Sequence, residues 1–405
     1  MGFKEDKKWW VSPSNFDSEV SKNLNFPKSI KILDTTLRDG EQQSGVILNK
    51  KEKVAIAKKL DEIGVHRIEA GTPAVSTEDA EAIKEIAGLG LKAEIFCFVR
   101  NLKKDIDLAK ECGVSGVIAE IPGSEHLLKL GAGWSVEKAI GAAIEATSHA
   151  HNLGLKVVFF PADGSRASID FLMDTVEKIV QGGGHMDSLT LVDTFGAFSP
   201  EGAARRVRQL IERFPSTPIE IHCHEDFGLG TACTLAGLAA GASVAHVTVN
   251  KIGERAGSAP LEHTVMALEA LYGINTGINL PKLKELSKLV EELSQSTVPE
   301  TYPIVGNKIF RWETGMPSML WENVKNTEPL VMLPYRWDLV GNEMPSLDIG
   351  KKSGNANLNV WLAKCNLSVP EEKKNDLLSA IKLKSIELKR TLNESEFRAL
   401  AAQHK

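Results

Sequence analysis

The chain has 405 residues, 42% of them hydrophobic, which is enough apolar material for one domain of about 250 residues and an accessory region. With 48 basic against 53 acidic side chains, the net charge is -5, which argues against nucleic acid or an anionic membrane as a partner. The five cysteines contain no CxxC pair, and neither a signal peptide nor a membrane-spanning apolar run is visible, so we expect a cytoplasmic protein.

An N-terminal extension, 1–29, precedes eight short runs that are rich in β-branched and aromatic residues. Between successive runs, apolar residues recur every three or four positions, which is typical of amphipathic helices. Asn49 and Ser199 stand where two of these helices would begin, and Pro200 suits a first helical position. The expected strands are 30–37, 67–71, 93–99, 116–122, 156–162, 188–194, 219–224 and 246–250.

This alternation of strand and helix predicts an α/β fold. Eight such units within 30–278 are what a closed (β/α)8 TIM barrel needs. Periodicity alone also fits an open, doubly wound sheet. The barrel is favoured because the first strand is followed not by GxGxxG but by RDGEQQSG, whose carboxylates would repel a phosphate.

Beyond the barrel the pattern changes. Residues 280–296 indicate one amphipathic helix, whereas 301–355 is rich in Pro, Gly, Trp and Asn without clear periodicity, as in a linker or a lid. Two helices, within 369–392 and 393–404, are expected to end a largely helical accessory region. The expected divisions are an N-terminal extension (1–29), a catalytic barrel (30–278), a helical linker (279–310) and a C-terminal subdomain (311–405).

Polar side chains gather where the expected strands end. In a TIM barrel the C-terminal ends of the strands carry the active site, so a charge cluster there indicates function rather than core packing. The residues concerned are Arg38, Asp39, Glu69, Asp163, Arg166, Asp193, Thr194, Asn250, Glu254 and Arg255.

The segment HCH is the strongest signal in the sequence. Alternation along a strand places His222 and His224 on one face and Cys223 on the other. Asp39 adds a carboxylate oxygen from across the barrel, and two imidazoles with one carboxylate suit a divalent cation that keeps open positions. A hydrogen-bonded pair of core histidines is the alternative, and Glu225 is a candidate further ligand or supporting partner.

Arg38, next to Asp39, is suited to hold a carbonyl oxygen that becomes negative as an enolate forms. The alternative is a structural salt bridge to Asp39 or Glu41. Thr194 is placed to bind a substrate carboxylate or hydroxyl, although a strand that ends in Asp193 and Thr194 is also typical of ordinary capping.

The loop after the last strand contains Gly253 and Gly257 around Glu254 and Arg255, so its backbone can turn sharply. Two interpretations remain open for this loop. It either holds the anionic arm of a thioester or is locked by a Glu254–Arg255 ion pair.

Taken together, these segments resemble landmarks of the metal-dependent (β/α)8 acyltransferases and lyases. That superfamily includes 2-isopropylmalate synthase, homocitrate synthase, citramalate synthase and, more distantly, HMG-CoA lyase. The matching segments, in the superfamily's order across 30–275, are LDTTLRDGEQ, IEAGTPAVS, LVDTFG, HCHEDFGLGTACTLAGLAAGA and IGERAGSAPLE, with LVGNEMPSLDIGKKSG as a weaker C-terminal landmark.

The resemblance implies that Asp39, His222 and His224 bind a divalent cation, Mg, Mn or Zn. It implies a Claisen-type condensation of an acyl-CoA, expected to be acetyl-CoA, with a 2-oxo acid, giving a 2-hydroxy-2-substituted dicarboxylic acid and CoA. It also implies a homodimer. The side chains expected to contact substrate are Gln42, Glu69, Arg100, Phe160, Arg166, Thr194, Glu254 and Arg255.

Several residues depart from the pattern of these synthases. Glu225 and Ser258 stand where Asn is common. On the fifth strand, Phe160 and Ala162 replace the Ser or Tyr and the Glu that usually approach the oxo acid. A more apolar or aromatic-tolerant acceptor pocket is the simplest consequence.

The catalytic base is the part of the site that departs most from the pattern of these synthases. Trp312 and Pro317 occupy the places of a His that the C-terminal region of the synthases lends to catalysis, and Lys352 stands where His is common. Glu225 or Asp163 is therefore the expected base. Two other functions stay open: cleavage of a 3-hydroxyacyl-CoA or a 4-hydroxy-2-oxo acid, and metabolite binding without catalysis.

Overall fold

The computed structural model describes residues 2–404, which divide into two compact units. One unit runs from residue 14 to 298, and the other combines the residues up to 13 with those from 299 onward. In the described chain, no helix has the length and apolar character needed to cross a membrane.

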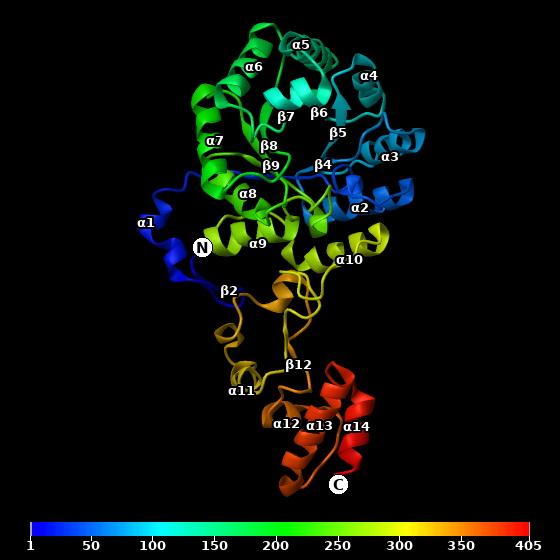
Figure 1. The fold of residues 1–405 in the computed structure, drawn as a ribbon, viewed down its shortest axis with the longest axis vertical. Coiled ribbons are helices and arrows are strands. Elements are labelled where there is room, and N and C mark those ends of the chain that lie inside the picture. Colours follow the sequence, from blue (N-terminus) through cyan, green and yellow to red (C-terminus); the bar gives the residue numbers. More distant parts are fainter. Residues whose placement is uncertain (1, 405) are drawn as a thin grey trace. The chain divides into compact units, whose positions relative to one another are not determined.

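The larger unit is a closed barrel of parallel strands (Figure 1). Each strand pairs with its neighbours in the sequence, and the last strand pairs with the first, so the predicted (β/α)8 fold is confirmed. The barrel strands are β3 (Lys31–Asp34), β4 (Arg67–Glu69), β5 (Glu94–Arg100), β6 (Gly116–Pro122), β7 (Lys156–Ala162), β8 (Ser188–Asp193), β9 (Ile219–Cys223) and β10 (Val244–Val247).

Helices surround these strands, and their first residues match the expected caps. Asn49 accepts a hydrogen bond from the N–H of Glu52, whose side chain in turn accepts from the N–H of Asn49. Ser199 caps the helix that begins at Pro200. The helices of this unit are α1 (Ser18–Ser21), α2 (Lys50–Ile63), α3 (Thr77–Ala87), α4 (Lys103–Glu111), α5 (Val136–Asn152), α6 (Ile169–Gln181), α7 (Pro200–Arg213), α8 (Gly230–Ala239), α9 (Leu261–Tyr272) and α10 (Leu283–Ser294).

Five strands, β3, β4, β8, β9 and β10, end earlier than the sequence pattern predicted, and the difference is largest for β3 and β10. β3 stops at Asp34, because its carboxylate accepts hydrogen bonds from the N–H and the hydroxyl of Thr36 and turns the chain. β10 covers Val244–Val247 rather than 246–250, since Asn250 adopts a left-handed conformation with φ +57°. The side chain of Asn250 is held there by two hydrogen bonds with Ser287.

The barrel interior contains an apolar layer, here called the barrel core cluster. A buried polar network lies in the same interior, and the ring of its His246 is 5.6 Å from that of His222. In that network Glu220 accepts hydrogen bonds from Arg67 (2.8 Å) and from His246 (2.7 Å). Burial acts to raise the pKa of Glu220, but the hydrogen bond from His246 and the charge of Arg67 outweigh it and lower the pKa to about 2. The barrel core cluster consists of Leu33, Phe96, Ile118, Val158, Phe160, Val192 and Val244, with Phe98 partly buried against it.

The smaller unit combines two short strand pairs with four helices. The N-terminal pair is antiparallel and the other pair is parallel. Helix α11 lies in the segment 301–355, where the sequence shows no clear periodicity. The helical pattern is masked there because Gly and Pro occupy the first turn of α11. The elements are β1 (Lys4–Glu5), β2 (Trp9–Trp10), β11 (Arg311–Trp312), α11 (Gly315–Val324), β12 (Ser346–Leu347), α12 (Asn355–Lys364), α13 (Lys374–Leu388) and α14 (Glu394–Ala402).

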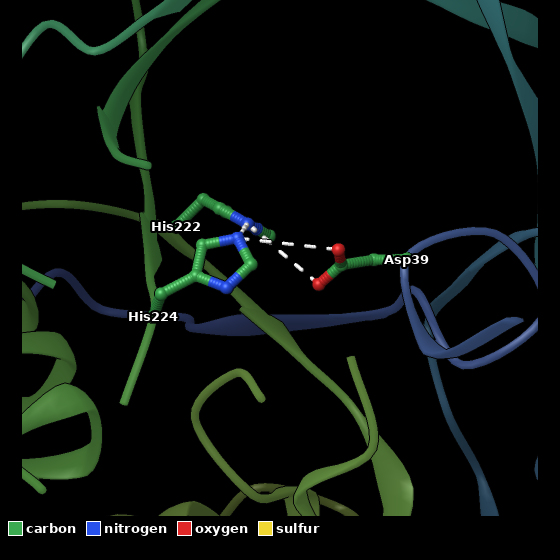
Figure 2. A group of neighbouring side chains, drawn as sticks. All are labelled: Asp39, His222 and His224. Atoms are coloured by element: carbon green, nitrogen blue, oxygen red, sulfur yellow. Dashed lines mark hydrogen bonds and ion pairs between the residues drawn. The ribbon is translucent and has the colours of Figure 1, made fainter. Parts of the chain in front are cut away.

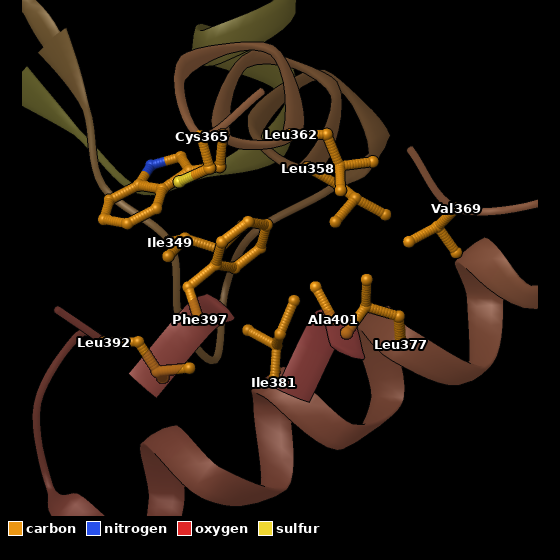
Figure 3. Packing of buried hydrophobic residues seen from close by; sticks show 11 residues of the cluster. Ile349, Leu358, Leu362, Cys365, Val369, Leu377, Ile381, Leu392, Phe397 and Ala401 are labelled. Carbon is orange, nitrogen blue, oxygen red and sulfur yellow. The ribbon is translucent and has the colours of Figure 1, made fainter. Parts of the chain in front are cut away.

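The last three helices pack around an apolar cluster of their own (Figure 3). Phe397 of α14 lies at its centre, and its ring lies 5.3 Å from that of Trp361 on α12. The Trp361 Nε1–H donates to the carbonyl of Leu347 (2.7 Å), so a buried indole remains satisfied. Asn393 caps α14 by accepting a hydrogen bond from the N–H of Glu396.

Candidate active site

A tight turn after β3 presents two charged side chains at the C-terminal end of the barrel. The backbone N–H groups of Arg38, Asp39 and Gly40 all donate to the carbonyl of Thr35, at 3.1, 2.8 and 3.2 Å. The turn therefore fixes Arg38 and Asp39 in buried positions just after the end of β3.

Asp39 meets two histidines there. Figure 2 shows the imidazoles of His222 and His224 facing the Asp39 carboxylate. The two Nε2 atoms are 3.2 Å apart, and each lies 3.9 Å from one oxygen of Asp39. All three side chains are at most 5% exposed. The sequence pattern therefore placed these three residues together correctly.

The loop after β10 orients two members of this cluster. His224 Nδ1–H donates to the carbonyl of Gly257 (3.1 Å), which leaves the Nε2 lone pair directed at Asp39. Ser258 donates from its hydroxyl to Asp39 Oδ2, and it is fully buried. Gly257 has φ +88°, and a Cβ there would lie 1.8 Å from the carbonyl oxygen of Lys251, so the sharp turn requires glycine.

His222 is held in an environment that favours the neutral imidazole. Burial lowers its pKa well below the usual range, and the neighbouring His224 lowers it further. The ring of Phe160 packs edge-on against it at 5.3 Å. Cys223 points to the other side of the strand, where burial raises the pKa of its thiol and disfavours a nucleophilic thiolate.

This donor set fits a divalent cation. Within residues 2–404 it is the one group of three His, Cys, Asp or Glu side chains that could hold a metal ion, and its ligand atoms all lie within 4.8 Å of one another. Asp39 Oδ1 is buried without a hydrogen-bond partner, so one oxygen is available to a ligand. Two neutral imidazoles and one carboxylate are suitable ligands for Mg, Mn or Zn.

Arg38 lies beside the cluster and is paired mainly with Glu69 of β4. Its Nε is 2.9 Å from a Glu69 oxygen, and its Nη1 donates to Gln42 (3.0 Å) and lies 3.6 Å from Asp39. Burial acts to lower the pKa of Arg38, but Glu69 and Asp39 outweigh it and raise the pKa. Arg38 does not form the salt bridge to Glu41 that was one of its alternative roles, since Glu41 binds Lys53 (2.6 Å).

A second polar cluster lies at the ends of β6, β7 and β8. Asp163 receives two hydrogen bonds from Arg166, at 2.6 and 2.9 Å. It also lies 2.7 Å from His126 Nε2 and 2.6 Å from the Ser124 hydroxyl. The backbone N–H of Asp163 donates to the Thr194 hydroxyl (2.7 Å), so Thr194 joins this cluster.

The cationic groups of this region share one aromatic ring. The guanidinium groups of Arg166 and Arg255 lie 4.1 and 5.3 Å from the centre of Phe195. Arg255 donates to Asp226 (2.9 Å) and lies 3.6 Å from Glu254, so the ion pair expected in this loop is present together with a second one.

Two predicted site residues instead make local contacts. Glu225 is buried and accepts hydrogen bonds from the N–H (2.9 Å) and the hydroxyl (3.2 Å) of Thr231, in the first turn of α8. Arg100, at the end of β5, forms a two-point ion pair with Asp105 (2.7 and 3.0 Å), with 57% of its side chain exposed.

The sequence pattern missed three residues of this region: Ser124, His126 and Glu120. Ser124 and His126 follow β6, whose last residues, Ile121 and Pro122, are apolar and give no sign of a polar cluster. Glu120 was hidden inside the apolar run GVIAEIP, where strict alternation would have assigned it to the barrel interior.

The chain is similar to several enzymes of known name. Residues 29–290 match the family model described as HMGL-like. Homocitrate synthase AksA of Methanothermobacter thermautotrophicus is 41% identical, over 86% of this chain and 86% of the relative. (R)-citramalate synthase CimA and 2-isopropylmalate synthase of Methanocaldococcus jannaschii are 38% and 37% identical, over 87% and 89% of this chain and 70% and 68% of their own lengths.

Solved structures share the barrel. HMG-CoA lyase of Bacillus subtilis superposes with a TM-score of 0.61 at 22% identity, over 68% of this chain and 97% of the lyase. Hydroxymethylglutaryl-CoA lyase of Pseudomonas aeruginosa has a TM-score of 0.60 at 19% identity, over 68% and 96%. These structures establish the fold, and the family follows from the sequence matches. The chain belongs to the HMGL-like family.

Proposed function

We propose that the protein is a metal-dependent acyltransferase of the isopropylmalate and homocitrate synthase type. It would condense an acyl-CoA, expected to be acetyl-CoA, with a 2-oxo acid and release CoA. The observation that carries the proposal is the buried cluster of Asp39, His222 and His224 with the Arg38 guanidinium beside it. The names of the relatives, homocitrate, citramalate and 2-isopropylmalate synthase, support this reaction class.

Asp39, His222 and His224 would hold the cation. When bound, a divalent cation supplies a Lewis acid that polarises the carbonyl group of the oxo acid. The chain prepares this site by keeping His222 neutral and by directing His224 Nε2 inward through the Gly257 carbonyl.

Arg38 supplies the fixed positive charge that the enolate of the thioester needs. It is buried and bonded to Glu69 and Gln42, so it does not have to reorganise when negative charge develops nearby. The rings of Phe98 and Phe160 lie 5.0 and 5.9 Å from its guanidinium and exclude water from this side.

The acceptor pocket is proposed to favour a 2-oxo acid with an apolar or aromatic side group. Phe160 borders His222, and Ala162 follows it on the same strand with a short apolar side chain. Arg166 and Arg255, at the outer edge, are proposed to contact the anionic groups of the substrates, together with Thr194 and Glu254 nearby.

The test is a release assay for free CoA. Purified protein is incubated with Mg²⁺, Mn²⁺ or Zn²⁺, acetyl-CoA and a panel of 2-oxo acids, and products are identified by mass spectrometry. The expected result is CoA release that needs both the cation and one oxo acid, and that is lost in Asp39→Asn and His222→Ala. No CoA release with any oxo acid or thioester, from protein with bound metal, contradicts the proposal.

The same assay distinguishes the reverse reaction. Cleavage of a 3-hydroxyacyl-CoA or of a 4-hydroxy-2-oxo acid, without condensation, would assign the protein to the lyases instead. The proposal also includes a homodimer in the cytoplasm. The cytoplasmic location is supported by five buried free cysteines, and light scattering of the purified protein measures the assembly.

A further inference from the structure

The proposed condensation needs a base that removes a proton from the acyl thioester. The identity of this base is inferred below and rests on the proposed function. The two expected bases are engaged elsewhere. Asp163 receives two hydrogen bonds from Arg166, and Glu225 accepts two from Thr231. These hydrogen bonds give both carboxylates a structural role, Asp163 in the cluster at the ends of β6 to β8 and Glu225, through one oxygen, at the first turn of α8.

Other carboxylates at the strand ends are engaged as well. Glu69 is paired with Arg38. Asp193 accepts hydrogen bonds from the N–H groups of Ala197 and Phe198, at 2.8 and 3.0 Å, and so holds the turn after β8. These two carboxylates therefore maintain the shape of the site.

Glu120 is different, and its place in the sheet directs it into the barrel. It lies near the end of β6, in register with Phe160 of β7. Ile118, two residues earlier on β6, belongs to the barrel core cluster, as does Phe160. Because side chains alternate along a strand, Glu120 points to the same interior, one layer closer to the C-terminal end, where the His222 ring packs against Phe160.

Its carboxylate has no partner there. Among residues 2–404, the Glu120 side chain makes no hydrogen bond or ion pair, and it is only partly buried. Because no other side chain occupies its lone pairs, this carboxylate can receive a ligand or a proton during function.

We propose that Glu120 is the general base of the condensation. The C–H bond at the α-carbon of the thioester breaks, the proton moves to the Glu120 carboxylate, and the electron pair forms an enolate whose oxygen faces Arg38. The enolate carbon then forms the new C–C bond to the carbonyl carbon of the oxo acid. The enolate supplies the electron pair of this bond and re-forms the thioester carbonyl, while the C=O π bond of the oxo acid breaks and its electron pair moves to the carbonyl oxygen. The proton from Glu120 then converts that oxygen to the product hydroxyl. Water finally hydrolyses the thioester and releases CoA.

The surrounding charges are compatible with this role. The charged groups that face Glu120 are Arg38, Glu69 and Glu254, whereas Arg100 on the adjacent strand is bound to Asp105. Burial raises the pKa of Glu120 to about 7, and the positive charge of Arg38 offsets part of this effect. A carboxylate with this pKa is partly ionised at neutral pH and basic enough to take a proton.

The test compares Glu120→Gln and Glu120→Asp with the wild-type enzyme. Glu120→Gln keeps size and polarity but removes the base, so kcat is expected to fall about 100-fold or more. The rise of kcat/KM with pH through neutrality should disappear in Glu120→Gln and persist in Glu120→Asp. Metal content and the Kd of the oxo acid should match the wild type. Glu111→Gln, on the exposed end of α4, is the matched control.

The outcomes separate this inference from the proposed function. If the wild type releases CoA and Glu120→Gln keeps its kcat or its pH profile, Glu120 is not the base, and the proposed function stands. If only the KM for the oxo acid rises, Glu120 selects substrate and the inference fails. If the wild type itself releases no CoA while holding metal, the proposed function fails and the base fails with it.

Discussion

Ser258 donates a hydrogen bond to Asp39, and so links the loop after the last barrel strand to the turn after the first. The same hydroxyl lies 3.4 Å from His224 Nδ1. Ser258 therefore contacts two of the three proposed metal ligands.

The first prediction follows from this link. Ser258→Ala should weaken metal affinity by about 10-fold or more, because a ligand that loses its supporting hydrogen bond is less well oriented. Titration of metal-depleted protein with Mn²⁺ measures the effect. Ser379→Ala, on the exposed face of α13, serves as control. Equal affinity in Ser258→Ala and wild type would show that Asp39 needs no such support.

The variant Arg38→Lys tests whether the fixed positive charge of Arg38 stabilises the enolate. Lysine keeps a positive charge but cannot contact Glu69 and Gln42 at once, so its ammonium would not be fixed in the same place. We expect kcat to fall about 100-fold with unchanged metal content, as when a preorganised oxyanion contact is removed. An unchanged kcat, with Arg213→Lys as the surface control, would remove Arg38 from the reaction.

Glu225 should behave as a helix cap. In Glu225→Gln the first turn of α8 loses a negative charge that accepts from Thr231, which should lower the free energy of unfolding by about 1 kcal/mol. The rate of CoA release per folded molecule should stay close to wild type. Urea unfolding and kcat measured on the same preparation decide the matter. A large loss of kcat at unchanged stability would return Glu225 to the role of base.

The raised pKa of Glu120 also predicts a pH dependence of stability. A carboxylate whose pKa rises from 4.5 to about 7 on folding favours the native state below pH 4.5, and that contribution is lost as the pH rises through 7. Glu120→Gln cannot ionise and escapes this loss. The free energy of unfolding of the variant minus that of the wild type should therefore be larger at alkaline pH than at acidic pH.

Urea unfolding at an acidic and an alkaline pH measures this difference. Glu69 is present in both proteins, so only the part of its raised pKa that is caused by the charge of Glu120 differs between them. If the free energies of unfolding of the variant and the wild type differ by the same amount at both pH values, Glu120 is not desolvated in the folded protein.

Much of the barrel and its proposed metal ligands could be predicted from sequence, for physical reasons. Buried parallel strands are apolar on both faces, so their runs are easy to recognise. Two histidines separated by one residue must share a face of a strand, so the sequence predicts that His222 and His224 lie together. Asp39 followed because it is charged at the end of a strand.

Other features depend on contacts between distant segments. The end of β10 is set by Asn250, which is held by Ser287 on a later helix. The role of Glu225 depends on where α8 begins, and the freedom of Glu120 depends on its having no partner in the folded barrel. A sequence pattern predicts the face of the strand on which a side chain lies, but it does not predict contacts with residues that are distant in the sequence.

The most direct test of the account is a crystal of the wild-type protein soaked in Mn²⁺ and measured for anomalous scattering. The account predicts one strong peak within bonding distance of Asp39, His222 Nε2 and His224 Nε2. A fully occupied Mn²⁺ site elsewhere, with these three side chains still hydrogen-bonded only to the protein, would contradict it.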